Sequence, residues 1–211
     1  MRQTVSKMSG RSFAELLATP GVEEICLLRS GFGIMAFHGG NLEKTTDDIA
    51  LIAAERAGAS VYVVRQPDGI RDHIASSKVT SPALDGFVAH VSECIAVHGY
   101  GRQGFWTSLL LGGQNRALAG RLARALESRL PDYEMVEELD DIPPELRGMH
   151  PSNPVNRPRL AGVQLELPPR VRGLTPHAAA WPRVEGRVPP TDAVIDALAE
   201  VAAAAQVSTG R

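Results

Sequence analysis

The chain has 211 residues, of which 44% are hydrophobic and 22% are charged, a composition ordinary for a globular protein with a sizeable core. The formal net charge is -2, so no overall positive field indicates a nucleic-acid-binding protein. No apolar run approaches the roughly 20 residues that span a bilayer, and residues 1–11 lack the apolar core of a secretion signal. We therefore expect a cytoplasmic protein, a monomer or small homo-oligomer, with no membrane or nucleic-acid partner.

The chain alternates between strand-like and helix-like segments. Apolar runs bounded by glycine or proline predict strands at residues 24–28, 34–38, 60–64, 93–98, 105–111, 134–138 and 162–167. Helical spacing and capping residues predict helices at residues 12–18, from 46 or 47 to about 57, and at 82–91, 115–130 and 192–206. Such alternation is typical of a mixed or parallel sheet that is covered by helices on both faces.

Local patterns refine three of these elements. Ser12 and Glu15 form the capping box of the first helix, and Thr191 is expected to cap the last one. The strands at residues 24–28 and 34–38 flank a short glycine-containing turn, so we expect them to pair as a hairpin. Two cysteines lie in strand-like segments; one disulfide between them can be drawn, but buried free thiols suit a cytoplasmic protein better.

The strand at residues 34–38 ends on a histidine that introduces a candidate site. His38 is followed by Gly39 and Gly40, and then by Glu43 just before a helix. Open α/β sheets place their ligands at the carboxyl ends of strands. The two glycines remove side-chain bulk, so a metal or substrate could approach the backbone there, and a turn at the glycines would bring His38 and Glu43 together.

Two later strands offer further groups. One ends on His98, and residues 162–167 form a strand whose alternation places Gln164 and Glu166 on one face. Two histidines and a carboxylate with an open fourth position are the ligand set of a catalytic zinc site. A further carboxylate is then needed to accept a proton from water. The alternative for each residue is a structural role, such as a hydrogen-bonded histidine at the rim of the sheet or a structural ion pair.

Several polar residues are candidates for substrate binding. His73 lies in a polar loop together with Arg71, and Arg116 and Arg157 occur later in the chain. The planar guanidinium of arginine suits a carboxylate, although most arginines simply face solvent.

The end of the chain differs from the rest. Residues 174–190 are proline-rich with little periodicity, whereas residues 192–206 have the pattern of an amphipathic helix. We therefore divide the chain into an α/β domain with the candidate zinc site, residues 1–173, and residues 174–211, a proline-rich strap and a helix packed on the same domain.

Five short motifs resemble those of the poly-γ-glutamate hydrolases, a bacterial and phage family, in the same order along the chain. They lie at residues 38–43, 71–74, 96–99, 111–118 and 162–167, and the resemblance runs from about residue 13 to residue 172. It implies a carboxypeptidase-like fold, with a mixed, mostly parallel sheet flanked by helices. It also implies a zinc ion held by His38, Glu43 and His98, with Glu166 as the catalytic acid and base.

One position departs from the family pattern. Asn41 and Leu42 stand where the family often has a third glycine and an isoleucine, and Asn41 could change how the loop approaches the metal. The resemblance favours zinc-dependent hydrolysis of the γ-glutamyl amide bonds of poly-γ-glutamate. Two alternatives stay open: a carboxypeptidase-like amidohydrolase acting on a small N-acyl amino acid, and a non-catalytic binder of an anionic polymer.

Overall fold

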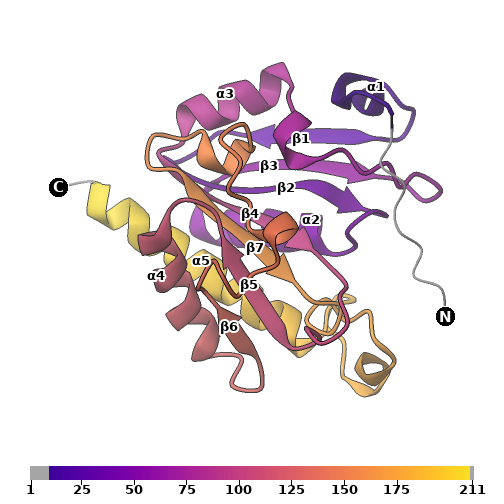
Figure 1. Ribbon diagram of the computed structural model, residues 1–211, viewed down its shortest axis with the longest axis vertical. Helices are drawn as coiled ribbons and strands as arrows, with labels where there is room; N and C mark the ends of the chain where they lie inside the picture. Colours follow the sequence, from indigo (N-terminus) through magenta and orange to yellow (C-terminus); the bar gives the residue numbers. More distant parts are fainter. Residues whose placement is uncertain (1–9, 210–211) are drawn as a thin grey trace.

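One mixed sheet forms the centre of the protein in the computed structural model, which describes residues 10–209 (Figure 1). Its strands, among the described residues, lie in the order β1-β3-β2-β4-β7-β5-β6. They are β1 (Glu23–Leu27), β2 (Phe32–Gly40), β3 (Ser60–Gln66), β4 (Glu93–Gly99), β5 (Ser108–Gly112), β6 (Glu134–Val136) and β7 (Gly162–Leu167). The helices are α1 (Phe13–Leu17), α2 (Thr46–Ala57), α3 (Pro82–His90), α4 (Arg116–Glu127) and α5 (Pro189–Thr209).

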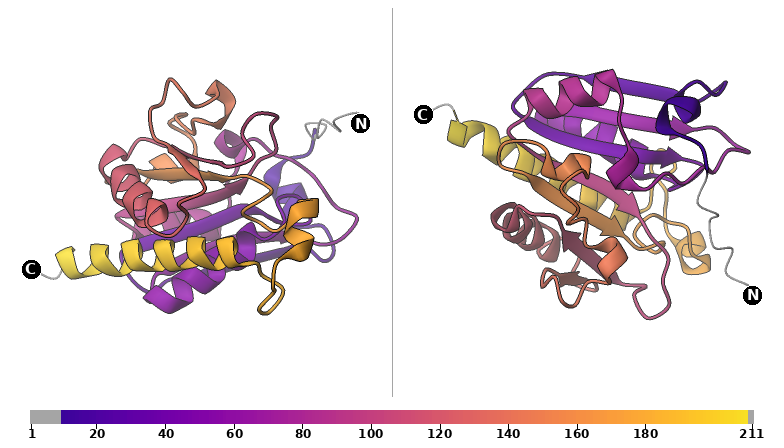
Figure 2. Two further views of the ribbon diagram at one scale, coloured as in Figure 1. Left: turned by 90° about the horizontal axis from the view of Figure 1, so that it is seen from below. Right: turned by 45° about the horizontal axis from the view of Figure 1, so that its top comes forward.

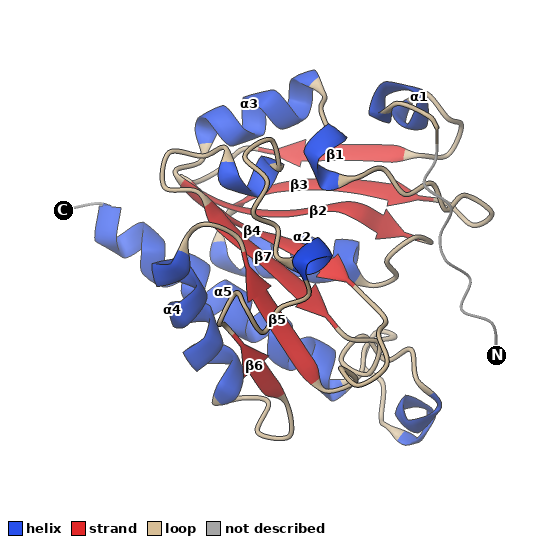
Figure 3. Cartoon of the chain, in the orientation of Figure 1, coloured by secondary structure: helices blue, strands red, loops and turns tan. Residues whose placement is uncertain are grey.

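Parallel pairing dominates the sheet. The pairs β3–β2, β2–β4, β4–β7 and β5–β6 are parallel, whereas β1–β3 and β7–β5 are antiparallel. Helices lie on both sides of these strands (Figure 3). The predicted fold class, a single α/β domain with a mixed, mostly parallel sheet, is therefore confirmed.

The expected hairpin between the first two strands is wrong. β3 lies between β1 and β2 and pairs with both of them. Val61, Tyr62, Val63 and Val64 of β3 are all buried, as in an interior strand covered on both faces. β1 has only one neighbouring strand, and its first residues, Glu23 and Glu24, are exposed, as suits the edge of a sheet.

The predicted helix ends are only partly observed. Ser12 and Glu15 form the expected capping box of α1. Gly58 ends α2 in the left-handed conformation. Thr191, however, does not cap α5, which begins two residues earlier at Pro189. The buried Thr191 hydroxyl instead donates to the carbonyl oxygen of Val171 at 2.7 Å, so it joins the helix to the segment that follows β7.

The two faces of the sheet have different roles. Helices α2, α4 and α5 cover one face, along which α5 runs as a long rod (Figure 2). Alternate residues of the interior strands point toward these helices and form the larger apolar core, which includes Ile34, Ala36, Val61, Val63, Ile95, Val97, Leu109, Leu111, Val163 and Leu165. The apolar burial on this face provides much of the driving force for folding.

The other face carries a smaller core and the polar residues of interest. Met35, Phe37 and Ala96 pack there against α1, α3 and connecting loops. Toward the carboxyl ends of β2, β4 and β7, this apolar cluster gives way to His38, His98 and Glu166. The site therefore lies at the strand-end rim that the sequence pattern predicts.

A β-bulge in β2 is needed to bring His38 to this face. β2 advances from Ala36 to Gly39 while β3 advances only from Val63 to Arg65, so β2 contains one extra residue there. Regular alternation would place His38 on the same face as Ala36, the face covered by the long helices. With the extra residue, His38 lies beside His98 instead, with 5.1 Å between the ring centroids.

Further expectations concern the two cysteines and the segments that could enter a membrane. Cys26 and Cys94 are free thiols, of which Cys94 is buried and Cys26 is partly buried. Within residues 10–209, no helix combines the length and the apolar character needed to cross a bilayer. The expectation that the chain lacks a secretion signal concerns residues that lie largely outside those the structure describes.

Candidate metal centre

Three buried side chains converge at the carboxyl ends of β2 and β4. Nδ1 of His38 lies 3.0 Å from Oε1 of Glu43, and Nδ1 of His98 lies 3.2 Å from Oε2 of the same carboxylate. One ligand atom from each of the three residues lies within 4.8 Å of the others. The structure thus brings together the three residues that the sequence suggests as metal ligands.

The second nitrogen of each imidazole has a different environment. Nε2 of His38 lies 2.8 Å from the carbonyl oxygen of Ile74. A carbonyl can only accept a hydrogen bond, so this nitrogen carries the proton and fixes the tautomer of the ring. Nε2 of His98 is buried and has no hydrogen-bond partner among the described residues.

The turn after β2 explains how Glu43 returns toward His38. The Glu43 amide donates to the carbonyl oxygen of His38 at 2.9 Å, and α2 begins directly afterward, at Thr46. The amide of Gly99 donates to Oε2 of Glu43 at 2.9 Å and anchors the carboxylate to the end of β4. A local turn and one long-range hydrogen bond therefore hold this carboxylate between the two histidines.

The glycines after His38 have a different purpose from the one expected. A Cβ on Gly39 would lie 2.5 Å from Cβ of Asp47, and one on Gly40 would lie 2.2 Å from the carbonyl oxygen of Gln66. Both contacts are far too short for real atoms. The glycines let β2 approach α2 and β3 closely, and the space that they free is filled by protein rather than by a ligand.

The electrostatics of the site favour the ionised form of the Glu43 carboxylate, which lies between two imidazoles. Burial raises the pKa of Glu43, but the imidazoles of His38 and His98 outweigh it and hold that pKa well below its ordinary value. Burial lowers the pKa of His98, but Glu43 outweighs it and raises that pKa above its ordinary value. Glu43 therefore stays negative, and His98 is drawn toward the positive state.

Glu166 is the second buried carboxylate of this region. It lies opposite His98 in the parallel β4–β7 pair and shares its strand face with Gln164, as the alternation predicts. Burial raises the pKa of Glu166 to about 7. A carboxylate with this pKa exchanges protons readily near neutral pH, which suits a general base.

A short hydrogen-bond chain orients Glu166. Nε2 of Gln164 donates to Oε1 of Glu166 at 2.9 Å, and Nδ2 of Asn153 donates to Oε1 of Gln164 at 2.8 Å. Because Asn153 fixes the carbonyl end of the Gln164 amide, the amino end must point toward Glu166. Only one carboxylate oxygen is thus occupied by Gln164.

A cavity of about 550 Å³ opens onto these residues. His38, Glu43, His98 and Glu166 lie in its wall, so the two histidines and both carboxylates share one space. Its other polar lining residues include Arg71, His73, Ser76, Ser77, Tyr100, Glu145, His150, Asn153 and Gln164.

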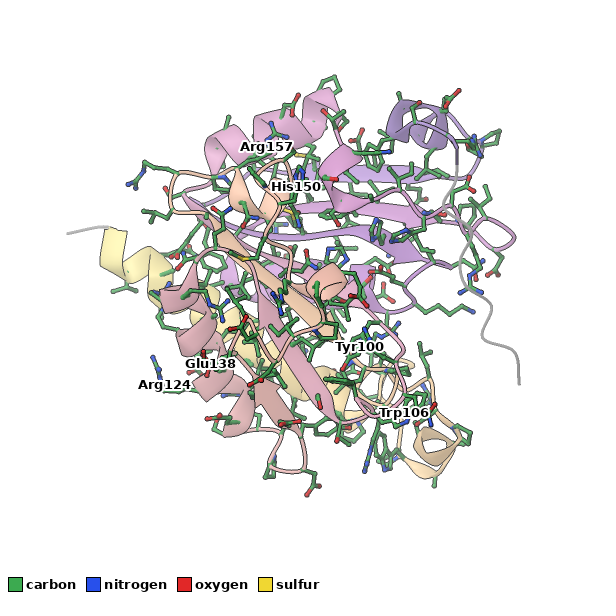
Figure 4. All side chains as sticks on the ribbon, viewed as in Figure 1. Tyr100, Trp106, Arg124, Glu138, His150 and Arg157 are labelled. Atoms are coloured by element: carbon green, nitrogen blue, oxygen red, sulfur yellow. The ribbon has the colours of Figure 1, made fainter. Side chains whose placement is uncertain are left out.

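The predicted substrate-binding residues divide into two groups. Arg71 and His73 line the cavity, and burial lowers the pKa of His73. Arg116 and Arg157 lie outside the cavity lining. The guanidinium of Arg116 donates to the main-chain oxygens of residues 111, 113 and 137. That of Arg157 pairs with Asp85 at 2.8 Å, beside α3 (Figure 4). The expectation that Arg116 and Arg157 bind a substrate carboxylate is not supported by their positions.

Sequence reasoning missed several polar residues of the cavity, among them His150 and Asn153. His150 and Asn153 both come from the irregular connection before β7, which passes in front of the sheet (Figure 4). Asn153 is fully enclosed, whereas His150 is exposed. The local sequence around them carries no strand or helix pattern, so nothing in it indicates which strand they reach.

Asn41, the position that departs from the family pattern, lies beside the loop that carries Arg71 and His73. Its amide donates from Nδ2 to the carbonyl oxygen of Ile70 at 3.2 Å. Its backbone amide donates to the carbonyl oxygen of Gln66 at 2.8 Å. Asn41 therefore tethers this loop to the turn after β2.

Comparison with known sequences decides the family. A sequence model described as poly-gamma-glutamate hydrolase matches residues 12–178, most of the chain. The chain belongs to this family. The resemblance seen in the five short motifs is thereby confirmed. No protein with a curated description matches the chain in sequence.

Solved structures agree on the fold. A bacteriophage poly-gamma-glutamate hydrolase superposes with a TM-score of 0.76 at 20% identity, covering 94% of this chain and 96% of the other. A zinc-free apo form of YNDL superposes with a TM-score of 0.67 at 18% identity, covering 85% of this chain and 88% of the other. A metallo-carboxypeptidase from Burkholderia cenocepacia superposes with a TM-score of 0.54 at 10% identity, covering 94% of this chain and 68% of the other. The carboxypeptidase-like fold expected from the sequence is thus confirmed.

Proposed function

We propose that this protein is a zinc-dependent hydrolase that cleaves the γ-glutamyl amide bonds of poly-gamma-glutamate. Membership of the poly-gamma-glutamate hydrolase family supports the substrate and the reaction. The observation that carries the zinc dependence is the convergence of His38, Glu43 and His98 on one buried point beside Glu166.

The hydrogen bonds of the three ligand residues fit a cation. His38 donates from Nε2 to a carbonyl, so its Nδ1 presents a bare lone pair to a carboxylate oxygen only 3.0 Å away when the ring is neutral. Two acceptors at this distance need a positive charge between them, either a proton or a metal ion. Two imidazole nitrogens and one carboxylate are a common catalytic zinc set, and a carbonyl on the opposite ring nitrogen is the usual outer support.

In this proposal, His38, Glu43 and His98 hold the zinc ion. When bound, zinc supplies Lewis acidity that polarises a carbonyl group and lowers the pKa of water. The buried Glu43 keeps its negative charge and offsets part of the charge of the ion.

Glu166 is the proposed acid and base. Its carboxylate accepts a proton from the attacking water and passes that proton to the nitrogen of the leaving amine. The Gln164 amide occupies Oε1 of Glu166 and fixes the plane of the carboxylate. This arrangement leaves Oε2 for the proton that moves during the reaction.

One arginine and several hydrogen-bond donors in the cavity suit an anionic polymer. Each unit of poly-gamma-glutamate carries a free α-carboxylate beside the amide bond. Arg71 lines the cavity and can bind such a carboxylate through two parallel hydrogen bonds. His73 and His150 lie in the same wall as further donors. The polymer is therefore held by its pendant carboxylates while one amide bond lies near Glu166.

Metal analysis and product analysis of the purified protein test this function together. We expect about one zinc ion per chain and cleavage of poly-gamma-glutamate to shorter glutamyl chains, both abolished by a chelator and restored by zinc. The variant His98→Ala should lose zinc and hydrolysis together. Cleavage of small N-acyl amino acids but not of the polymer would indicate the amidohydrolase alternative. Polymer binding without zinc or cleavage would indicate the non-catalytic binder.

A further inference from the structure

A buried arginine outside the cavity lining connects the three segments of the candidate site. The side chain of Arg172 donates from Nη1 to the carbonyl oxygen of Lys44 at 3.2 Å. It donates from Nη2 to that of Tyr100 at 3.0 Å and from Nε to that of Leu167 at 3.2 Å. Arg172 is only 7% exposed, so these contacts are enclosed by protein.

The three carbonyls are not randomly placed. Lys44 directly follows Glu43, Leu167 directly follows Glu166, and Tyr100 is two residues beyond His98. A guanidinium is planar and rigid, so carbonyls bonded to it have fixed relative positions. One side chain therefore sets the spacing between the backbone segments that carry both carboxylates and one histidine.

The surroundings of Arg172 leave little freedom. A Cβ on Gly99 would lie 2.6 Å from the centre of the guanidinium, so the end of β4 packs directly against it. Burial lowers the pKa of Arg172, and the charges of Glu43 and Glu166 act in the opposite direction. An arginine stays charged in such a place, so its positive charge also acts on both carboxylates of the site.

The backbone around Arg172 is fixed from two sides. The carbonyl oxygen of Val171 accepts from the Thr191 hydroxyl at 2.7 Å, and that of Gly173 accepts from Nη2 of Arg183 at 3.1 Å. On the other side, the Thr45 hydroxyl oxygen lies 3.4 Å from the carbonyl oxygen of Arg172. The start of α5 therefore holds the backbone beside Arg172 by a hydrogen bond, and the start of α2 packs against it.

We propose that Arg172 is a positioning residue that holds the backbone of Glu43, His98 and Glu166 in register for metal binding and hydrolysis. The consequence for zinc rests on the proposed function. Arg172 touches neither the metal ligands' donor atoms nor the cavity, and it acts through the three carbonyls. Residues that orient metal ligands in this way typically contribute about 10–100-fold in metal affinity or activity.

The variant Arg172→Lys tests the proposal, because a lysine keeps the charge but cannot present three donors in one plane. Arg116→Lys is the matched control, since Arg116 also donates to three main-chain carbonyls but outside the site. Two measurements are compared: zinc affinity by competition with a chelator, and hydrogen–deuterium exchange of the metal-free protein.

We expect the zinc dissociation constant of Arg172→Lys to rise by about 10–100-fold, and that of Arg116→Lys to stay at the wild-type value. Exchange in metal-free Arg172→Lys should rise together at residues 43–46, 98–101 and 166–168. Wild-type zinc affinity and wild-type exchange in these three segments would overturn the proposal. If wild-type protein binds no zinc, the proposed function fails. The exchange measurement, which needs no metal, then still decides whether Arg172 positions the three segments.

A measurement on the wild-type protein covers the case in which Arg172→Lys does not fold. The Nε–H of a guanidinium held by three carbonyls gives a slowly exchanging signal in nuclear magnetic resonance spectra. Zinc addition should shift the Arg172 signal, because the carbonyls that it binds adjoin the ligands, and should leave the Arg116 signal in place. An Arg172 signal that exchanges freely or ignores zinc would contradict the positioning role.

Discussion

Glu166 is the side chain that we propose as the acid and base of the site. Its environment combines deep burial, a single amide donor and an open cavity on its remaining side. The substitution Glu166→Gln keeps the size of the side chain and removes the proton acceptor. We expect hydrolysis of poly-gamma-glutamate to fall by about 10²–10⁴-fold or more, with zinc content unchanged. Parallel measurement of turnover and metal content checks this outcome.

Glu93→Gln is the matched control for that substitution. Glu93 stands at the amino end of β4, opposite the end that carries His98, and pairs with Arg121 at 2.9 Å. The same change of chemistry there should leave turnover at the wild-type rate. Wild-type turnover in Glu166→Gln would return Glu166 to a structural role, and the reaction would need another base.

Arg71 and Arg157 provide a second comparison, because only Arg71 lines the cavity. A charge-assisted hydrogen bond contributes about 1.5–3 kcal/mol, which corresponds to roughly tenfold or more in binding. We therefore expect Arg71→Gln to raise KM for poly-gamma-glutamate by about tenfold or more and to change kcat little. Arg157→Gln breaks only the surface pair with Asp85 and should leave KM unchanged. Equal KM values for the two variants would remove Arg71 from the substrate site.

The residues that sequence reasoning did not find share a physical reason. His38, His98 and Glu166 stand at or near the ends of recognisable strands, so their meeting point follows from the architecture. Asn153 and Arg172 lie in segments without strand or helix periodicity. Gln164, the partner of Asn153, is 11 residues away, and Lys44, one partner of Arg172, is 128 residues away. Local sequence carries no record of such distant contacts.

At the scale of elements, the positions of the strands along the chain are easier to predict than the order in which the strands pair. The apolar segments fix where strands form because burial favours them wherever they lie. They do not fix which strand is inserted between two others. β3 comes later in the chain than β1 and β2, yet it separates them, since its apolar residues need cover on both faces. The bulge that turns His38 toward the site is likewise a tertiary feature, set by pairing with β3.

The close approach of β2 to β3 yields a prediction about glycine. Gly40 and Gly58 both have positive φ angles, 68° and 62°, but only Gly40 has neighbours that a Cβ would meet. Gly58→Ala should lower the free energy of unfolding by about 1–2 kcal/mol, the cost of the left-handed conformation alone. Gly40→Ala should cost clearly more and should also weaken zinc binding, because the strand that carries His38 must shift. Denaturant unfolding of the metal-free variants and a zinc titration check both statements. Equal stability of the two variants would mean that the backbone at Gly40 relaxes freely.

At the scale of the whole molecule, the larger apolar core and the candidate site lie on opposite faces of the sheet. One face is sealed by α2, α4 and α5, and the candidate site lies at the rim of the opposite face. α5 spans the sealed face, and the hydroxyl of its Thr191 donates to the carbonyl oxygen of Val171, the residue before Arg172. We therefore propose that residues 174–211 are an integral part of the domain. Deletion of these residues should abolish cooperative unfolding, and unchanged stability and hydrolysis after the deletion would contradict this proposal.

Single substitutions on α5 test whether its buried side chains stabilise the domain. Leu198 is fully buried against the sheet, whereas Val207 on the same helix is 70% exposed. Removing the Leu198 side chain leaves a cavity, so Leu198→Ala should lower the free energy of unfolding by about 2–5 kcal/mol. Val207→Ala removes almost no buried surface and should leave it unchanged. Both variants should hydrolyse poly-gamma-glutamate at the wild-type rate at temperatures where they remain folded, because neither side chain reaches the cavity. Urea unfolding and turnover measured on the same samples check both parts. A Leu198→Ala protein with wild-type stability would show that α5 does not contribute its apolar face to the core.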